Sequence, residues 1–222
     1  MSALVPFHEL ATATYCPRKL YYARQSGVAV PASVERVRAL ALAYPDLLAA
    51  PDEALAERAI EVAPAVFRGR LHRARKRFTD VWEELVDPPE RDVRLTGRDC
   101  RGEVQKILDT DAPTPSLVSP GEPPEQGVWE PQSVRAVAAA KALAWREETP
   151  VERAFVEYPA YGVVREVRLT TRRKATYRRA LRAVRSLDGP PPRLSNDAKC
   201  RECEHRAECG VRTRSLWSLL GR

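Results

Sequence analysis

The stretch Tyr15-Cys16-Pro17-Arg18-Lys19-Leu20-Tyr21-Tyr22, taken together with Cys200-x2-Cys203-x5-Cys209 near the other end of the chain, decides how this sequence is interpreted. Four thiolates are the ligand set of a zinc ion or of an iron–sulfur cluster. One ligand would come from the start of the chain and three from its end, so a metal held by all four would tie the two termini together. The predicted metal ligands are Cys16, Cys200, Cys203 and Cys209.

Several interpretations of these cysteines compete. Structural disulfides are disfavoured because Met1–Leu10 has neither the basic start nor the apolar centre of a secretory signal, and we therefore expect a reducing, cytoplasmic location. Zinc sites usually take their ligands from two pairs that lie close in sequence. The one-plus-three spacing favours a [4Fe–4S] cluster, with zinc or no metal as the alternatives. Cys100 lies in an alternating apolar segment and is interpreted as a packed small side chain.

The composition is that of one domain with a basic surface. Of the 222 residues, 44% are hydrophobic, and no run approaches the roughly 18 apolar residues of a membrane span. The formal net charge is +7, and Arg far outnumbers Lys. Such a surface suits phosphate partners, although a GC-rich genome produces the same bias. We expect a single domain over 1–222 without a membrane partner.

Hydrophobic periodicity predicts helices and strands in the order of a mixed α/β domain. The predicted helical segments are 7–25, 34–50, 52–60, 64–86, 131–146 and 171–187. The predicted strands are 93–97, 103–108, 116–119, 154–158 and 163–169, with turns at 101–102 and 160–162. This order predicts an α/β fold with a mixed central sheet flanked by helices.

The predicted helix over 171–187 carries a row of arginines on its outward side. We interpret these side chains as contacts to the DNA backbone, and the alternative is a solvated helical face. The basic segment 68–77 has the same two interpretations. The predicted DNA-binding residues are Arg172, Arg173, Arg178, Arg179 and Arg182.

The cysteine frame, with three motifs between its two parts, resembles the RecB-like iron–sulfur exonucleases associated with CRISPR systems. Gly69-Arg70-Leu71-His72 resembles the family's Gly-Arg-x-His helix. Gly102-Glu103-Val104-Gln105-Lys106-Ile107 lies where the family has Gly-x-x-Asp-Lys-Ile. Gly121-x-Pro123 is similar to the Lys-x-Gly-x-Pro that follows the family's second carboxylate. The resemblance extends from about residue 7 to about residue 210.

The resemblance implies a PD-(D/E)xK nuclease core over about residues 64–187 and a cluster-binding portion formed by about 1–30 and 195–210. It also implies a DNA exonuclease, in which an Asp and a Glu hold Mg²⁺ or Mn²⁺, a Lys stabilises charge and an upstream His adds a ligand. The implied partners are DNA and the CRISPR adaptation proteins. The implied pathways are spacer acquisition, defence or repair.

The sequence departs from the family pattern at the catalytic positions. The expected Asp, Glu and Lys are replaced by Gln105, Leu117 and Ser119, and the Gln usual on the following helix by Arg135. An amide and an alkyl chain offer neither charge nor a bidentate oxygen pair to a hard divalent cation. We therefore expect a degenerate nuclease in which His72 is a remnant, and Mg²⁺ or Mn²⁺ is expected only if the site is active.

Two alternatives differ in kind from a degenerate nuclease. The first is an active exonuclease with a rearranged metal site that uses Asp99, Glu103, Asp109 or Asp111. The second is a zinc-stapled binding module without enzymatic activity, for which His205 is a possible further ligand.

Overall fold

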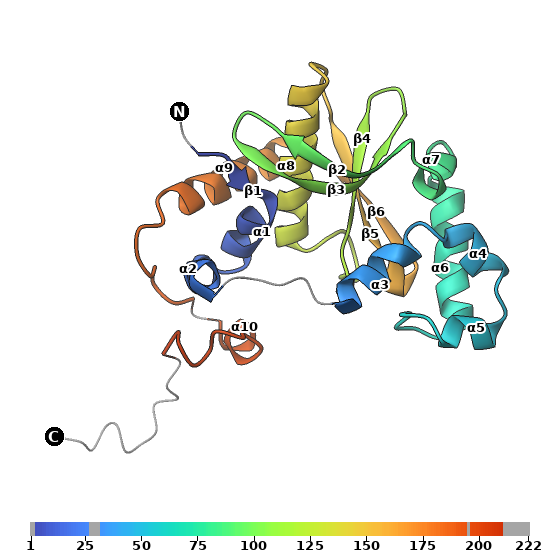
Figure 1. Cartoon of the computed structure of the whole chain (residues 1–222), viewed down its shortest axis with the longest axis horizontal. Helices are drawn as coiled ribbons and strands as arrows, with labels where there is room; N and C mark the ends of the chain where they lie inside the picture. Colours follow the sequence, from blue (N-terminus) through green and yellow to red (C-terminus); the bar gives the residue numbers. More distant parts are fainter. Residues whose placement is uncertain (1–2, 27–31, 195, 211–222) are drawn as a thin grey trace.

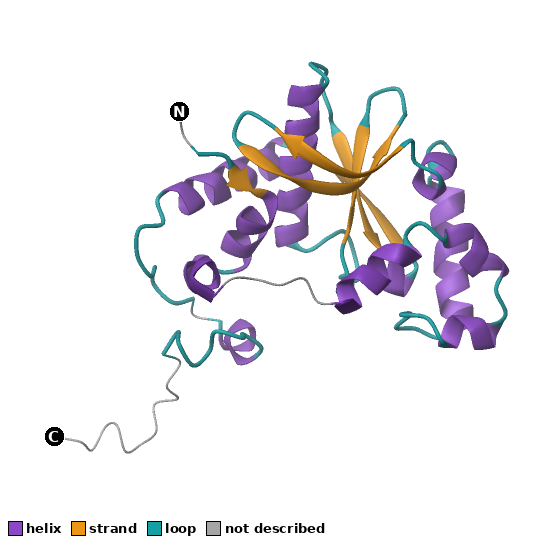
Figure 2. Ribbon diagram, viewed as in Figure 1, coloured by secondary structure: helices purple, strands orange, loops and turns teal. Residues whose placement is uncertain are grey.

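A computed structural model describes residues 3–26, 32–194 and 196–210. The described residues form a six-stranded mixed sheet with helices on both faces, which confirms the predicted α/β fold (Figures 1 and 2). The strands are β1 (Val5–Pro6), β2 (Glu90–Thr96), β3 (Cys100–Leu108), β4 (Thr114–Val118), β5 (Arg153–Tyr158) and β6 (Val163–Arg168).

Strand β3 organises the sheet. One of its edges pairs antiparallel with β2. Its other edge pairs with β1 in parallel at Cys100–Arg101 and with β4 antiparallel at Lys106–Leu108. No described strand pairs with this second edge between those two contacts, so β3 and β4 separate at Gln105. Beyond β4 the order continues through β5 to β6, which is an edge strand.

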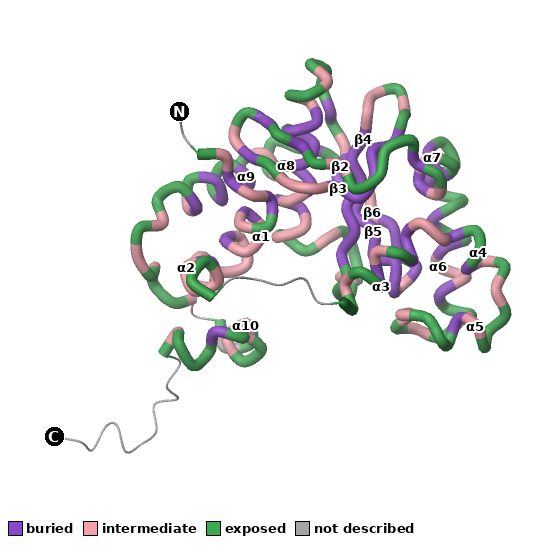
Figure 3. Tube along the Cα trace, in the orientation of Figure 1, coloured by how far each residue is buried: buried purple, intermediate pink, exposed green. Residues whose placement is uncertain are grey.

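Helices cover both faces of the sheet, and each face has its own hydrophobic core (Figure 3). One face carries α1 (Phe7–Tyr15), α8 (Glu130–Arg146) and α9 (Thr171–Arg185). The other carries α3 (Ala32–Leu40), α4 (Tyr44–Ala49), α5 (Asp52–Ala56), α6 (Pro64–Arg77) and α7 (Trp82–Val86). The remaining helices are α2 (Pro17–Ser26), η1 (Pro159–Tyr161) and α10 (Asp197–Arg201).

Two glycines allow the first helical layer to approach the sheet closely. A Cβ atom on Gly97 would lie 2.7 Å from the Cα atom of Ala142 in α8. A Cβ atom on Gly102 would lie 2.3 Å from the ring of Phe7, which begins α1. Side chains at these positions would push both helices away from β3, so the glycines fix how α1 and α8 sit over the sheet.

Three details of the predicted secondary structure are wrong. The helix predicted over 7–25 is two helices, α1 and α2, separated at Cys16, whose backbone is extended. The helix predicted over 64–86 is two helices, because α6 ends at Phe78, whose ring packs edge-on against Phe155 with 5.3 Å between centroids. The turn predicted at 101–102 lies inside β3. The chain turns earlier, where the Gly97 amide donates to the Cys100 carbonyl at 2.9 Å. In the last two cases tertiary packing overrides a local pattern.

Candidate functional site

The four predicted metal ligands line one pocket between the two ends of the chain. Helix α1 ends at Cys16, whose amide donates to the Thr12 carbonyl at 2.8 Å, and Pro17 begins α2. Cys200 lies in α10, and Cys203 and Cys209 lie in the turns that follow it. The structure thus brings together cysteines that are more than 180 positions apart in the sequence.

Protein contacts alone already join the two ends at this pocket. The Lys199 ammonium donates to the Tyr15 carbonyl at 3.2 Å and lies 4.7 Å from the centroid of the Tyr15 ring. The Tyr15 hydroxyl donates in return to the Lys199 carbonyl at 3.4 Å. Lys19 forms an ion pair with Glu204 at 3.1 Å. Figure 1 shows α2 and α10 next to each other, which agrees with these bonds.

Positive charge surrounds the cysteine pocket. Lys19, Lys199 and Arg206 line it together with the thiols. Burial opposes the charge of Arg18, but hydrogen bonds to the Cys209 sulfur and to Tyr22 leave the pKa of its guanidinium raised. Burial also raises the pKa of Tyr15, which Lys19 partly offsets. The pocket thus places the four thiols among basic side chains.

The donor set fits a four-thiolate metal centre better than a site that uses His205. The ring of His205 is buried, and its Nδ1 lies 3.1 Å from Glu208 while its Nε2 lies 3.6 Å from Glu204. Both ring nitrogens are therefore engaged by carboxylates. Among the described residues, no group of three or more His, Cys, Asp or Glu side chains stands at metal-ligating geometry, so the cluster stays a prediction.

Three of the predicted catalytic positions gather where β3 and β4 separate. Continuing the register of Lys106 with Ser116 by one step places Gln105 opposite Leu117. The Gln105 side-chain oxygen accepts a hydrogen bond from the Val118 amide at 2.9 Å. The Ser119 hydroxyl accepts one from Gln132 on α8 at 3.4 Å. We call this place the β3–β4 fork.

The chemistry of the β3–β4 fork is unsuited to a divalent cation. Leu117 is 2% exposed and packs in the core. The amide of Gln105 is committed to Val118, and its buried nitrogen has no partner among the described residues. Arg135 reaches the fork from α8 and donates to the Val118 carbonyl at 3.4 Å. A guanidinium repels a metal ion at the place where two carboxylates would attract it.

The charge of Arg135 is constrained by its surroundings. Burial and the nearby Arg38 lower the pKa of Arg135, and Glu103 opposes them, so that the pKa is about 10. Arg38 lies 3.8 Å from Glu103 and 2.9 Å from Glu35, both measured between side-chain nitrogen and oxygen. Arg135 remains a cation at neutral pH, because the lowered value is still well above 7.

The other residues considered for catalysis do not assemble into a site. His72 is exposed on α6, and no described hydrogen bond or ion pair involves it. Asp99 forms an ion pair with Arg185 at 3.0 Å at the start of β3, whereas Asp109 lies beyond the end of this strand. Ten residues of extended chain separate these two carboxylates by about 30 Å. They cannot ligate one ion, and Asp111 lies further along the chain.

Lys106 and Glu157 form a buried ion pair that sequence reasoning missed. The Lys106 ammonium lies 2.9 Å from a Glu157 carboxylate oxygen, and both side chains are 0% exposed. The only signal in the sequence is a Lys and a Glu inside two apolar strand segments, Val104–Leu108 and 154–158. Lys and Glu are almost never fully buried unless they are paired with an opposite charge, as these two are.

The predicted DNA-binding arginines lie on helix α9, whose buried residues face the core. Arg172, Arg178 and Arg182 are exposed, and no described carboxylate pairs with them. Arg179 lies 3.7 Å from Glu130, and Arg173 donates to the Arg168 carbonyl at 2.9 Å. No described helix is long and apolar enough to cross a membrane.

Comparison with known proteins gives no family for this chain. No family model matches the sequence, and no curated protein matches it. A solved structure described as the crystal structure of SSO0001 is similar over 91% of this chain and 94% of its own, with 12% sequence identity and a TM-score of 0.35. A superposition of this quality carries no argument about fold family or function.

Proposed function

We propose that this protein is a RecB-like, PD-(D/E)xK-fold member of the CRISPR-associated iron–sulfur exonuclease family that has lost nuclease activity and acts by binding DNA or partner proteins. Bound to Cys16, Cys200, Cys203 and Cys209, a [4Fe–4S] cluster would supply a structural cross-link between the two ends of the chain. This proposal implies a cytoplasmic location, because thiols stay reduced in the cytoplasm. Spacer acquisition, defence or repair are the pathways it implies, with CRISPR adaptation proteins as possible partners.

The proposed loss of nuclease activity rests on one observation. The β3–β4 fork presents an amide, a buried leucine and a guanidinium, Gln105, Leu117 and Arg135, where two carboxylates would have to hold a divalent ion. Phosphodiester hydrolysis of this class depends on that ion to stabilise the attacking and leaving oxygens. DNA binding needs only cations, and the exposed arginines of α9 supply them.

The test of this proposal separates binding from cleavage. We expect no degradation of single-stranded or double-stranded DNA with saturating Mg²⁺ or Mn²⁺. We expect DNA binding that weakens steeply with salt and that weakens further when Arg178, Arg179 and Arg182 are replaced by Ala together. Degradation that is lost in Asp99→Asn or Glu103→Gln would instead establish an active exonuclease with a rearranged site. A zinc-loaded protein that binds no DNA would establish the zinc-stapled module.

A further inference from the structure

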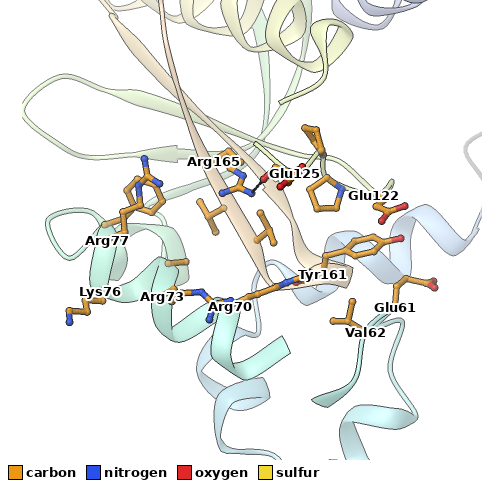
Figure 4. A pocket seen from close by; sticks show the side chains of 17 residues that line it. Glu61, Val62, Arg70, Arg73, Lys76, Arg77, Glu122, Glu125, Tyr161 and Arg165 are labelled. Atoms are coloured by element: carbon orange, nitrogen blue, oxygen red, sulfur yellow. Dashed lines mark hydrogen bonds between the residues drawn. The ribbon is translucent and has the colours of Figure 1, made fainter. Parts of the chain in front are cut away.

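A basic groove runs beside the edge strand β6, between helix α6 and the loop that follows β4 (Figure 4). Strand β6 contributes Val163, Val164 and Arg165 to it, and the loop contributes 122–125. Its cationic lining residues are Arg70, Arg73, Lys76, Arg77 and Arg165. We call this feature the β6 groove.

The five positive charges of the β6 groove outnumber the three glutamates that also line it. None of its five cations forms an ion pair with a described carboxylate. Arg70 donates to the Tyr161 carbonyl at 3.4 Å, and the Arg77 guanidinium lies 5.4 Å from the centroid of the Phe78 ring. Arg165 donates to the Glu125 carbonyl at 3.2 Å, and its Nε is buried without a partner. Neutral groups thus position several of these cations and leave their charges free for a ligand.

The backbone of β6 also has unused hydrogen-bonding groups. The Leu169 amide donates to the Glu152 carbonyl at 2.8 Å, which makes this a hydrogen-bonded pair in the register of β5 with β6. Such pairs alternate in an antiparallel ladder, so Val164 and Glu166 direct their N–H and C=O groups away from β5. No described residue forms a hydrogen bond with these groups; Glu166 is partly exposed, whereas Val164 lines the groove but is only 4% exposed. An edge of this kind is a template for another strand.

The other residues that line the groove favour a peptide over a nucleic acid as its ligand. Three glutamates, Glu61, Glu122 and Glu125, lie among the lining residues and interrupt the positive charge, so the groove suits a ligand whose acidic groups alternate with apolar ones better than a phosphate backbone, which is charged at every unit. The apolar groups that line the groove, including Pro123 and Val163, offer contacts that suit side chains of a peptide. Helix α9 carries exposed arginines and no acidic residue of its own, although Arg179 lies 3.7 Å from Glu130 of α8, so it suits a phosphate backbone better.

We propose that the β6 groove binds an extended acidic peptide segment of a partner protein, which pairs with β6 as an added strand. Its backbone would bond to Val164 and Glu166, and its acidic side chains would meet the arginines of α6. Strand addition derives affinity from main-chain hydrogen bonds and specificity from alternate side chains. This inference is independent of the nuclease fold and of the cysteine pocket, so failure of either leaves it standing.

The first test measures charge complementarity by fluorescence anisotropy. The probe is a labelled peptide of alternating Glu and Val, about eight residues long, which is within the usual length of a strand. We expect salt-sensitive binding that weakens by at least about tenfold in Arg73→Glu/Arg77→Glu, because like charges then face each other. Arg178→Glu/Arg182→Glu on α9 makes the same change in net charge and should leave peptide binding intact. A matching peptide of Lys and Val should not bind.

The second test asks whether the peptide pairs with the strand edge. Methylating the backbone nitrogens of either the Glu or the Val residues blocks one edge of the peptide at a time. One methylation pattern should abolish binding and the other should preserve it. Hydrogen exchange at the Val164 and Glu166 amides should slow when the unmethylated peptide binds.

Three results would overturn the proposal. The first is the absence of peptide binding in the folded wild-type protein. The second is equal binding of both methylated peptides, which would exclude strand addition. The third is a result in which Arg73→Glu/Arg77→Glu weakens the binding of labelled oligothymidine but not that of the peptide. The groove would then be a nucleic-acid surface.

Discussion

Lys106 is a buried lysine whose ammonium group has three acceptors. It donates to the Ala41 and Leu85 carbonyls, each at 2.6 Å, and to Glu157 at 2.9 Å. The second Glu157 oxygen accepts from the Ser116 hydroxyl at 2.6 Å. Burial lowers the pKa of Lys106, and the Glu157 carboxylate opposes this effect. The pair connects β3 and β5 to the residue that follows α3 and to helix α7.

Replacing Lys106 should therefore destabilise the folded protein. Lys106→Met leaves the Glu157 carboxylate buried without its cation, which should lower the free energy of unfolding by about 3–5 kcal/mol. The matched control is Arg146→Met, which breaks an exposed pair with Glu90 and should change it by about 0–1 kcal/mol. Urea unfolding measures both variants. An effect of Lys106→Met no larger than that of the control would contradict a structural role for the pair.

Cys100 differs chemically from the other cysteines. Burial raises the pKa of its thiol to about 11, and the Tyr177 hydroxyl, 3.4 Å away, partly offsets this. Because the thiolate is the reactive form, Cys100 should resist iodoacetamide at pH 8 in the folded protein. Mass spectrometry after alkylation measures this, with denatured protein as the control. The thiol ionises at lower pH in the unfolded state, so stability should start to fall at about pH 9. Buried tyrosines with raised pKa values, such as Tyr44 and Tyr158, add to the decline above about pH 10, so Cys100→Ala should remove only the part between about pH 9 and 10. Rapid native labelling of Cys100 would contradict the assigned burial.

At the scale of elements, the β3–β4 fork brings together the positions that the resemblance assigns to metal-dependent catalysis. Gln105 lies one step beyond the paired part of β3 and β4, where its side-chain oxygen accepts from the amide of Val118, the neighbour of Leu117, and Ser119 follows. Arg135 approaches from α8. The positions that the resemblance assigns to a metal site are thus neighbours in space, although the residues present do not suit one.

Introducing two carboxylates at the fork should create metal binding there if these positions correspond to the family's catalytic residues. In the variant Gln105→Asp/Leu117→Glu/Ser119→Lys/Arg135→Gln, two acids replace an amide and an alkyl chain, and a repelling cation is removed. We expect this variant to be less stable than the wild type without metal, because it buries charge. Mn²⁺ should raise its melting temperature and leave that of the wild type unchanged. A folded variant that binds no more Mn²⁺ than the wild type would show that the assigned positions are wrong.

Most elements were predictable from local pattern, and the exceptions have tertiary causes. Strands β3, β4, β5 and β6 alternate or lie in short apolar runs, and α8 and α9 have helical spacing, so the sequence located them. The end of α6 at Phe78 depends on a contact with Phe155, and β1 depends on pairing with Cys100. The Lys106–Glu157 pair and the β6 groove depend on which segments become neighbours in the folded chain. Hydrophobic periodicity does not specify this.

At the scale of the whole molecule, the cysteine pocket closes nearly the entire chain into one loop. Apart from a metal, the ends are joined by a few polar contacts, such as Lys19 with Glu204 and Arg18 with the Pro191 carbonyl at 2.8 Å. Exposed pairs of this kind contribute little. By analogy with a cross-link, a metal on all four cysteines would add stability on the order of 5 kcal/mol.

Losing one ligand should therefore release both ends of the chain. We expect Cys16→Ala to lose its metal and to be cleaved faster by trypsin near residues 18–24 and 199–206, because metal binding is coupled to local folding. Cys100→Ala should keep its metal and the wild-type cleavage pattern. Equal metal loss in both variants would contradict the assignment of the four ligands.

The measurement that tests the central claim most directly is the metal content of protein purified without oxygen. If the cysteine pocket holds a [4Fe–4S] cluster, the protein should be brown, absorb broadly near about 400 nm, and contain about four iron and four sulfide per chain. Cys16→Ala should be colourless. A colourless wild-type protein with one zinc per chain, or with no metal, would contradict the account.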